Sequence, residues 1–541
     1  MKNKTINIIL ILSFIFVSSC KDLTEINTNP VGVYEVTSDF YLSTVLTDAA
    51  NVYHNGVYSD YSILGLMQYL QKDWHGGSES NFDWEPMGWS EYYSILRTNK
   101  KLYEQAVNNE EEFYQGVSLI MKSFLFGFIT DLWGDAPYSE ALQGNDELFY
   151  PKYDDQEDIY TGLLADLETA NTLLSKNTDE YILGSPAYDV IYNGNPSKWR
   201  KLANSLLLRY YMRLSEKLPG VAQEGVEKIL TNPTEYPVFE SNADNAFVAY
   251  IGSESWDSWS GGELYDATGD EFRRRKPCRT MVDTLNSLND PRLEIWIKPV
   301  DIQIVVEQEP YTNNEPDITI DDKRFLHDTV SILQGGNYDT SKYVGLPPNM
   351  PDARTYNLET TLTDGYNSHI SSLTDMYRAD AHELVKANLI TYAEVCFIKA
   401  EAAQKGWGAG GGASEFYNQG VSAALSQYGV GSGEADNYLT RERVQFDNSL
   451  ERIIEQKWLS LWMSPESWFD YRRTGFPVIQ LGDGALFSEL PLRFIYSDDE
   501  QLNNAENWNL AVDKLEETQY SMQKDHHYSK MWLLQGTGKP Y

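Results

Sequence analysis

The segment from Phe113 to Leu142, which reads FYQGVSLIMKSFLFGFITDLWGDAPYSEAL, constrains the fold more than any other part of the chain. Its apolar residues recur at steps of three and four positions, which predicts one long, deeply buried helix. Gly134 suits the left-handed position after the last helical turn, and Pro137 prevents the helix from continuing. We therefore expect a helical domain organised around this helix and the aromatic, acidic turn after it. The apolar stripe consists of Val117, Ile120, Met121, Phe124, Leu125, Phe128, Ile129 and Leu132.

Size and composition fit an ordered protein with a large core. The chain has 541 residues, of which 42% are hydrophobic and 13% aromatic, and a chain of this length buries a large apolar surface. Its 43 Lys and Arg are outnumbered by 80 Asp and Glu, which gives a net charge of −37. Because neutralising phosphates requires clustered cations, this charge argues against a nucleic acid partner. The simplest interpretation is a well-solvated acidic surface.

The first residues predict a targeting segment, not part of the fold. Lys2 and Lys4 precede a short apolar run, and Ser18-Ser19-Cys20 resembles a bacterial lipobox. In that interpretation residues 1–19 are a lipoprotein signal peptide and Cys20 is lipidated, with about 0.8 kcal/mol of anchoring per buried methylene. The alternative is a plain secretory signal with an incidental Cys20. Residues 22–36 are polar and read as a tether.

The other two cysteines, Cys278 and Cys396, are too few for an extracellular disulfide framework. Cys396 lies on an apolar helical stripe and is expected to be a small buried hydrophobic residue. A bridge between the two stays open at this level.

Helical periodicity predicts a scaffold in two parts, residues 36–231 and 385–475, separated by a loop-rich, partly β insertion over 232–384 and followed by a C-terminal cap over 476–541. Asn195 followed by Pro196 marks a helix start. A pair of helices joined by the turn Gly408–Gly412 looks like a degenerate tetratricopeptide repeat, although no fixed period is visible. The expected helices span 38–52, 58–71, 89–107, 158–174, 197–214, 389–405, 414–428 and 450–461.

Several segments together resemble the SusD/RagB family of nutrient-binding outer-membrane lipoproteins. They run in order through nearly the whole chain: TDLWGDAPYSEAL at Thr130–Leu142, NPSKWRKLANSLLLRYYMRLS at Asn195–Ser215, LNDPRL at Leu288–Leu293, YVGLP at Tyr343–Pro347, TYAEVCFIKAEAAQKGW at Thr391–Trp407, FYNQGVSAALSQYGV at Phe416–Val430, IIEQKWLSLWMSPESWFDYRRTGFP at Ile453–Pro477 and LPLRFIYSDDEQLNNAENW at Leu490–Trp508.

The resemblance implies a mostly α fold of about four tetratricopeptide-like helical pairs that forms one SusD-like domain over residues 20–541. It also implies a lipid-anchored protein on the outer face of the outer membrane. Such a protein captures an oligosaccharide and delivers it to a TonB-dependent, SusC-like transporter; an oligopeptide ligand is the alternative. The resemblance implies binding without catalysis. Calcium occurs in some relatives, but no ligand-spaced acidic loop is present, so no cofactor or metal is expected.

Two loops carry the residues that sugar recognition needs. Aromatic rings stack on the apolar faces of sugars, and neighbouring polar groups bond their hydroxyls. The first loop contains Trp74 and Trp84; the second contains Trp256, Trp259 and nearby Tyr265. Because exposed tryptophans cost solubility unless they bind something, we expect these five side chains to bind the ligand. The second loop is the stronger case, since its two tryptophans lie three positions apart among small polar residues and follow no apolar period. The alternative for either loop is that its tryptophans pack back onto the scaffold.

Other conspicuous residues are expected to be structural. Trp133, Trp199 and Trp458 lie on or beside apolar stripes and are expected in the core. Asp131 and Asp135 are expected to cap the next helix or to pair with Arg472 or Arg473. The only cationic run, Arg273–Lys276, is expected to be solvated or paired with carboxylates, the alternative being contact with an anionic substituent.

No familiar catalytic motif is present. The pair His382-Glu383 lacks the second histidine of a zinc protease, and neither a G-x-S-x-G turn nor a phosphate-binding loop occurs. A helical glycoside hydrolase remains the enzymatic alternative, because its two carboxylates are recognised only by their separation in space.

Overall fold

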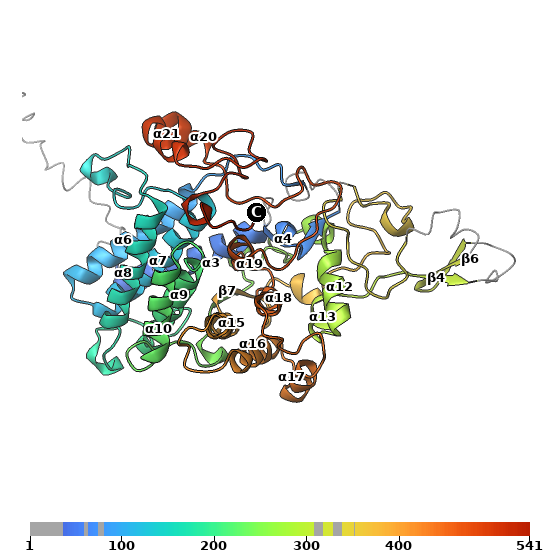
Figure 1. Ribbon diagram of the computed structural model, residues 1–541, viewed down its shortest axis with the longest axis horizontal. Coiled ribbons are helices and arrows are strands. Elements are labelled where there is room, and N and C mark those ends of the chain that lie inside the picture. Colours follow the sequence, from blue (N-terminus) through green and yellow to red (C-terminus); the bar gives the residue numbers. More distant parts are fainter. Residues whose placement is uncertain (1–35, 59–62, 74–80, 308–316, 328–337, 351) are drawn as a thin grey trace, which may run out of the picture.

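The structure, a computed structural model, describes residues 36–541 except 59–62, 74–80, 308–316, 328–337 and 351. The predicted signal peptide and Cys20 therefore lie outside the described residues. Helices form most of the body, with the N-terminal helices at one end of the long axis and a small sheet at the other (Figure 1). The prediction of a mostly α fold is confirmed.

Helix α7 (Glu112–Trp133) is the predicted central helix. It ends at Gly134, which has a φ of 94°, a backbone conformation that residues with a side chain rarely adopt. A Cβ there would also lie 3.0 Å from Cβ of Met531, so the close approach of the C-terminal cap adds to the need for glycine. Among the described residues, α7 alone is long and apolar enough to cross a membrane, but 94% of its apolar window is buried inside the protein. It is the core of the fold.

The scaffold helices pack in sequence around α7. Helix α3 contacts α6, α6 contacts α7, α7 contacts α8, α8 contacts α9, and α9 contacts α10, while α15 packs on both α16 and α18 (Figure 1). This layering of neighbouring helices is the tetratricopeptide-like arrangement. The bounds are α3 Ser38–Tyr58, α6 Ser90–Asn108, α8 Gln156–Leu173, α9 Pro196–Arg213, α10 Pro219–Thr231, α15 Tyr392–Gln404, α16 Ala413–Gln427, α17 Ser432–Leu439, α18 Leu450–Ser460 and α19 Glu466–Thr474.

Caps fix where several of these helices begin. The side chain of Asn195 accepts a hydrogen bond from the backbone N–H of Lys198 at 3.2 Å, with Pro196 as the first helical residue, as predicted. The Asp135 carboxylate accepts a hydrogen bond of 2.9 Å from the backbone N–H of Gln156, the first residue of α8, and so caps that helix. The predicted capping role of Asp135 is confirmed.

Residues 232–384 are loop-rich and partly β, with short helices. Strand β1 (Leu70–Lys72) pairs with β3 (Arg275–Pro277), and β2 (Ala246–Ala249) pairs with β7 (Lys386–Ile390), both antiparallel. In the third sheet β6 (Lys323–His327) lies between β4 (Gln303–Glu307), which is parallel to it, and β5 (Asp317–Ile320), which is antiparallel. The short helices here are α11 Asp270–Arg274, α12 Arg279–Leu288 and α13 Arg292–Trp296.

The helix predicted over residues 58–71 is wrong. In the described part of this segment, Tyr58 ends α3, and the short helix α4 (Ile63–Leu66) and strand β1 follow. Ile63, Leu66, Met67 and Leu70 are all buried, so the apolar stripe correctly indicated burial. An apolar stripe this short fits a helix or a strand equally well. The second half of the segment is a strand because it pairs with β3.

The C-terminal cap, with α20 (Asp498–Asn503) and α21 (Ala505–Asp513), packs back onto the N-terminal helices. The indole N–H of Trp133 lies 3.2 Å from the carbonyl oxygens of Met87 and Ile495, so it bridges two loops that are distant in sequence. Trp133, Trp199 and Trp458 are buried in the core, as predicted. Cys278 and Cys396 are buried free thiols, so the two are not bridged.

Candidate functional site

Trp259 anchors the loop that follows β2. Its side chain is buried and its indole N–H donates to the carbonyl oxygen of Tyr377 at 3.0 Å. The ring packs beside His54 of α3 and Tyr250, with ring centroids 6.2 and 5.8 Å away. The backbone N–H of Trp259 donates to the carbonyl oxygen of Asp380 at 2.9 Å. These contacts tie the loop to α3 and to residues 377–380, which precede β7.

The turn before Trp259 is closed by Asp257. Its carboxylate accepts the backbone N–H groups of Ser253 at 2.8 Å and Glu254 at 2.9 Å. Its carbonyl oxygen accepts the N–H of Ile251 at 2.9 Å. Desolvation alone raises the pKa of Asp257, but the hydrogen bonds from Ser253 and Glu254 outweigh it and lower the pKa. The turn therefore keeps its carboxylate ionised and its backbone fixed at neutral pH.

Trp256 lies in this fixed turn, and its side chain is exposed. Its indole is 68% exposed, while its carbonyl oxygen accepts a hydrogen bond from the Asn51 amide of α3 at 3.3 Å. Ile251, Leu264 and Tyr265 are also exposed, with Tyr265 at 54%. We call residues 251–265 the Trp256 segment. It presents apolar and aromatic side chains to solvent from a rigid backbone, which is the arrangement that a stacking platform for a ligand requires.

The far end of the segment is held by Asp380. Its carboxylate accepts the backbone N–H of Leu264 at 2.6 Å. Gly262 allows this approach, because a Cβ there would lie 2.7 Å from the Cα of Asp380. The backbone N–H of Gly262 also closes a turn on the carbonyl oxygen of Trp259 at 2.8 Å. The positions of Leu264 and Tyr265 are thus fixed by residues more than a hundred positions away in the chain.

The structure separates the predicted binding residues. Trp256 and Tyr265 are exposed, whereas Trp84 and Trp259 are buried. Trp84 packs edge-on against Phe494 at 5.2 Å and Trp468 at 5.8 Å. The prediction that Trp84 and Trp259 stack on a ligand is therefore wrong, because both indoles are enclosed by other aromatic side chains. Trp74 lies outside the described residues.

Sequence reasoning missed Ile251 and Leu264, which extend the exposed apolar surface on both sides of Trp256. The signal was present: both are large apolar residues among Gly, Ser, Asp and Glu, outside any helical or strand period. Only the structure shows that both are exposed in the same segment as Trp256 and Tyr265.

The cationic run Arg273–Lys276 is paired with carboxylates. Arg273 bonds Asp270, and Arg275 lies 2.8 Å from Glu271. Arg274 contacts Glu271 at 3.3 Å and Asp364 at 3.4 Å. Burial lowers the pKa of Lys276, which lies beside Asp73, although that carboxylate raises it in part. The expectation of carboxylate pairing is confirmed for the three arginines, whereas the Lys276 ammonium donates to the carbonyl oxygen of Gly365 at 3.2 Å.

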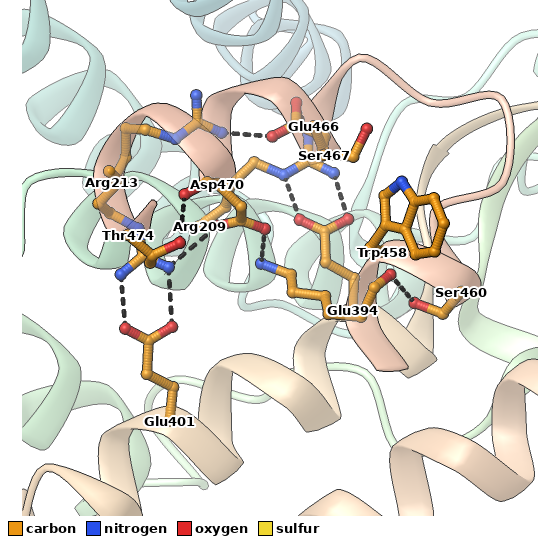
Figure 2. Close-up of polar contacts among 12 residues, drawn as sticks. Arg209, Arg213, Glu394, Glu401, Trp458, Ser460, Glu466, Ser467, Asp470 and Thr474 are labelled. Carbon is orange, nitrogen blue, oxygen red and sulfur yellow. Dashed lines mark hydrogen bonds and ion pairs between the residues drawn. The ribbon is translucent and has the colours of Figure 1, made fainter. Parts of the chain in front are cut away.

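Five acidic and five basic side chains form a second notable cluster, at the junction of α7, α9, α15, α18 and α19. Arg209 holds Glu394 with two hydrogen bonds of 2.7 Å and Arg213 bonds Glu466, as Figure 2 shows. Arg213 also lies 2.6 Å from Asp131. The buried charge cluster consists of Asp131, Glu394, Glu401, Glu466 and Asp470 with Arg209, Arg213, Lys457, Arg472 and Arg473, all buried.

The buried charge cluster is structural. Burial alone raises the pKa of Glu466, but Arg209 and Arg213 outweigh it and lower the pKa. Lys457, 2.6 Å away, and Arg473, 2.9 Å away, likewise lower the pKa of Asp470 against the effect of burial. Burial raises the pKa of Asp131, although Arg213 and Arg472 lower it in part. All five carboxylates are paired with cations and shielded from solvent, so they are not placed to reach a glycosidic bond. Pairing of Asp131 with Arg472 is confirmed at 3.9 Å, with Arg213 as the closer partner.

No group of three or more His, Cys, Asp or Glu side chains is placed to hold a metal ion within the described part of the chain.

Comparison with known proteins defines the class. A family model described as SusD-like, "Starch-binding associating with outer membrane", matches residues 30–497. Because this match spans most of the chain, the protein belongs to the SusD-like family. A comparison with curated proteins finds no match.

Solved structures of similar fold include a chitin-binding protein with 24% identity and a TM-score of 0.70, covering 92% of this chain and 98% of that one. An outer-membrane protein from Bacteroides vulgatus described as involved in nutrient binding has 26% identity and a TM-score of 0.71, covering 91% and 100%. A chitin-binding SusD homologue from Flavobacterium johnsoniae has 20% identity and a TM-score of 0.67, covering 92% and 97%.

Proposed function

We propose that this protein captures oligosaccharides at the cell surface through the Trp256 segment and delivers them to a TonB-dependent, SusC-like transporter. The observation that carries the proposal is the Trp256 indole, 68% exposed on a backbone fixed by Asp257 and Asn51. A rigid aromatic platform loses little conformational entropy on binding. Each ring contact contributes about 0.5–1.5 kcal/mol beyond the burial of area. Exposed Tyr265 supplies a second ring, and Trp74, which lies outside the described residues, remains a predicted third contact.

The description of the family as starch-binding supports a glycan as ligand. Two of the similar solved proteins are chitin-binding. Malto-oligosaccharides and chito-oligosaccharides are therefore the first probes to use. Peptides of similar length form the comparison panel for the alternative ligand.

The binding test compares the unmodified protein with the double variant Trp256→Ala and Tyr265→Ala by titration calorimetry. We expect the affinity for the bound oligosaccharide to fall by roughly tenfold or more, because two stacking contacts are lost. Trp407→Ala is the matched control, since Trp407 is a partly exposed tryptophan that packs near Lys405 in another part of the scaffold. Equal affinity in the double variant, or binding of peptides but not glycans, would contradict the proposal.

Release of the ligand without cleavage is part of the proposal. The buried charge cluster offers no exposed carboxylate pair, which argues against its use in hydrolysis. Incubation of the purified protein with a glycan that it binds should produce no new reducing ends. Turnover that follows the protein through purification would favour the hydrolase alternative.

The predicted anchor is also a proposal, because it rests on the sequence of residues 1–20. We expect cleavage before Cys20 and acylation of its thiol, so that the protein fractionates with the outer membrane and is accessible to protease on intact cells. Cys20→Ala should release the protein from the membrane fraction. Retention of that variant in the membrane would contradict lipid anchoring while leaving glycan binding untouched.

Delivery requires a membrane partner. We expect affinity purification of the tagged protein from detergent extracts to recover a TonB-dependent transporter identified by mass spectrometry. Absence of such a transporter from the purified material would contradict the delivery step.

A further inference from the structure

A cavity lies beside the C-terminal helix pair, apart from the Trp256 segment. In Figure 1, α20 and α21 stand at the edge of the body. Their hold on it is slight: no residue of α20 is buried and, in α21, only Ala511 is. Polar contacts fix the pair, including the bond from the Asn504 amide to the carbonyl oxygen of Pro151 at 2.8 Å. On one side the pair encloses a cavity of about 280 Å³, the Trp508 cavity, lined in part by Tyr496, Asp498, Gln501, Trp508 and Val512.

Trp508 gives this cavity an aromatic wall. Its ring is half-buried, and its indole N–H has no hydrogen-bond partner among the described residues. A buried indole N–H normally finds an acceptor, because leaving it unpaired costs about 1–3 kcal/mol. That N–H is itself closed off from the surrounding space, so the ring, and not the N–H, is the part of Trp508 that lines the cavity.

The rim of the cavity supplies free polar groups. The Asp498 carboxylate and the Gln501 side-chain amide are exposed and make no hydrogen bond or ion pair within the described ranges. The other charged lining residues are already engaged, since Asp525 pairs with Arg493 at 2.6 Å and Lys524 with Asp513 at 3.3 Å. The cavity therefore carries one uncompensated negative charge, on Asp498, together with an amide and an aromatic ring.

We infer that the Trp508 cavity is a second binding site, for a single sugar ring that carries no carboxylate. The inference rests on the proposed glycan-binding function. An aromatic wall takes the apolar face of a pyranose, while Asp498 and Gln501 accept and donate to its hydroxyls. The volume lies near the lower limit of about 300 Å³ for ligand pockets, so it fits one ring and not a longer chain. Asp498 repels uronic acids and tolerates amino sugars.

The test uses saturation-transfer NMR on the full-length protein in detergent, with glucose, N-acetylglucosamine, glucosamine and glucuronic acid as probes. It is run on the unmodified protein and on the Trp256→Ala/Tyr265→Ala variant, which lacks the proposed primary platform. In both, we expect saturation of the three sugars without a carboxylate and none of glucuronic acid. Trp508→Ala should weaken this binding roughly three- to tenfold, the equivalent of one stacking contact.

Gln501→Trp is a second test of the cavity, needed in case Trp508→Ala loses sugar binding because it misfolds. Gln501 is exposed, so a large side chain there blocks the cavity without entering the core, and we expect loss of sugar binding with an unchanged unfolding temperature. Trp407→Ala, which is remote from the cavity, should bind as the unmodified protein does.

Two outcomes overturn the inference: affinity in Trp508→Ala and Gln501→Trp equal to that of the unmodified protein, or binding of glucuronic acid equal to that of the other sugars. These differ from failure of the proposed function. If the cavity is empty but Trp256→Ala/Tyr265→Ala abolishes oligosaccharide binding, the primary platform stands alone. If the double variant binds normally while Trp508→Ala does not, the cavity stands and the primary platform is wrong.

Discussion

The buried charge cluster and the Trp256 segment contrast in the way they place their side chains. In the cluster, ten ionisable groups are removed from water and balanced against one another, as Arg209 is against Glu394 at 2.7 Å. In the segment, the large indole of Trp256 is exposed to water, while the backbone that carries it is fixed by hydrogen bonds such as that from Ser253 to Asp257. Charged residues here build the interior, whereas exposed aromatic residues mark the surface where a ligand is expected. A carboxylate or a tryptophan is thus informative about function only through its partners.

The largest effect is expected from breaking the cluster. Glu466→Ala leaves Arg209 and Arg213 without one of their carboxylates in a buried site. Truncating one partner of such a network typically costs about 3–5 kcal/mol of unfolding free energy. Urea denaturation measures the loss. Glu442→Ala, at an exposed position, is the control, and an equal effect of the two would show that the cluster does not stabilise the fold.

A comparable loss is expected from Trp259→Ala. Trp259 is 1% exposed, and truncating a buried tryptophan to alanine costs about 3–5 kcal/mol through lost transfer energy and a residual cavity. The variant should also loosen the segment, since the bond to Tyr377 disappears. Thermal unfolding monitored by circular dichroism checks this. A fully stable variant would mean that the loop is held by other contacts.

Acid should weaken the cluster selectively. Arg209 and Arg213 lower the pKa of Glu466 below its ordinary value of 4.5, and Lys457 and Arg473 lower that of Asp470 below 3.8, in both cases against burial. The unfolded chain therefore binds protons before the folded one does. The stabilisation is present above those ordinary values and is lost as pH falls below about 4.5. Glu466→Gln should flatten this fall, measured as unfolding free energy between pH 7 and 3; an unchanged slope would contradict the assignment.

The smallest effect on stability is expected from Trp256→Ala. Because its side chain is mostly in water and its backbone contacts do not depend on the indole, the free energy of unfolding should change by less than about 0.5 kcal/mol. Denaturation side by side with Trp259→Ala is the direct comparison of the two tryptophans. A loss above 2 kcal/mol on the same scale would show that Trp256 is a packing residue in solution.

Sequence predicted the parts of the fold that local rules decide. The central helix ends at Gly134 as expected, and α9 starts at Pro196 after the Asn195 cap. The prediction from periodicity was wrong between Ile63 and Leu70, where a short apolar stretch was compatible with either a helix or a strand. It also missed α12 in the insertion.

The candidate site could be located from sequence only to the level of a loop. Trp256 and Trp259 lie three positions apart among the same kinds of neighbours, yet one is exposed and the other buried. What separates them is contact with Tyr377 and His54, far away in the chain. The prediction for Trp84 was wrong for the same reason, since its ring is enclosed by Phe494 and Trp468, which are also far away in the chain. No local pattern carries such information.

The order of the cluster along the chain bears on biogenesis. Arg209 leaves the ribosome long before Glu394 and Glu466, its two ion-pair partners, whereas Asp131, one partner of Arg213, comes earlier still. Enclosing the Arg209 guanidinium without its carboxylates would leave a charge uncompensated in the interior. We therefore expect a nascent or truncated chain that ends before Glu394 to depend on chaperones and not to form a smaller folded protein.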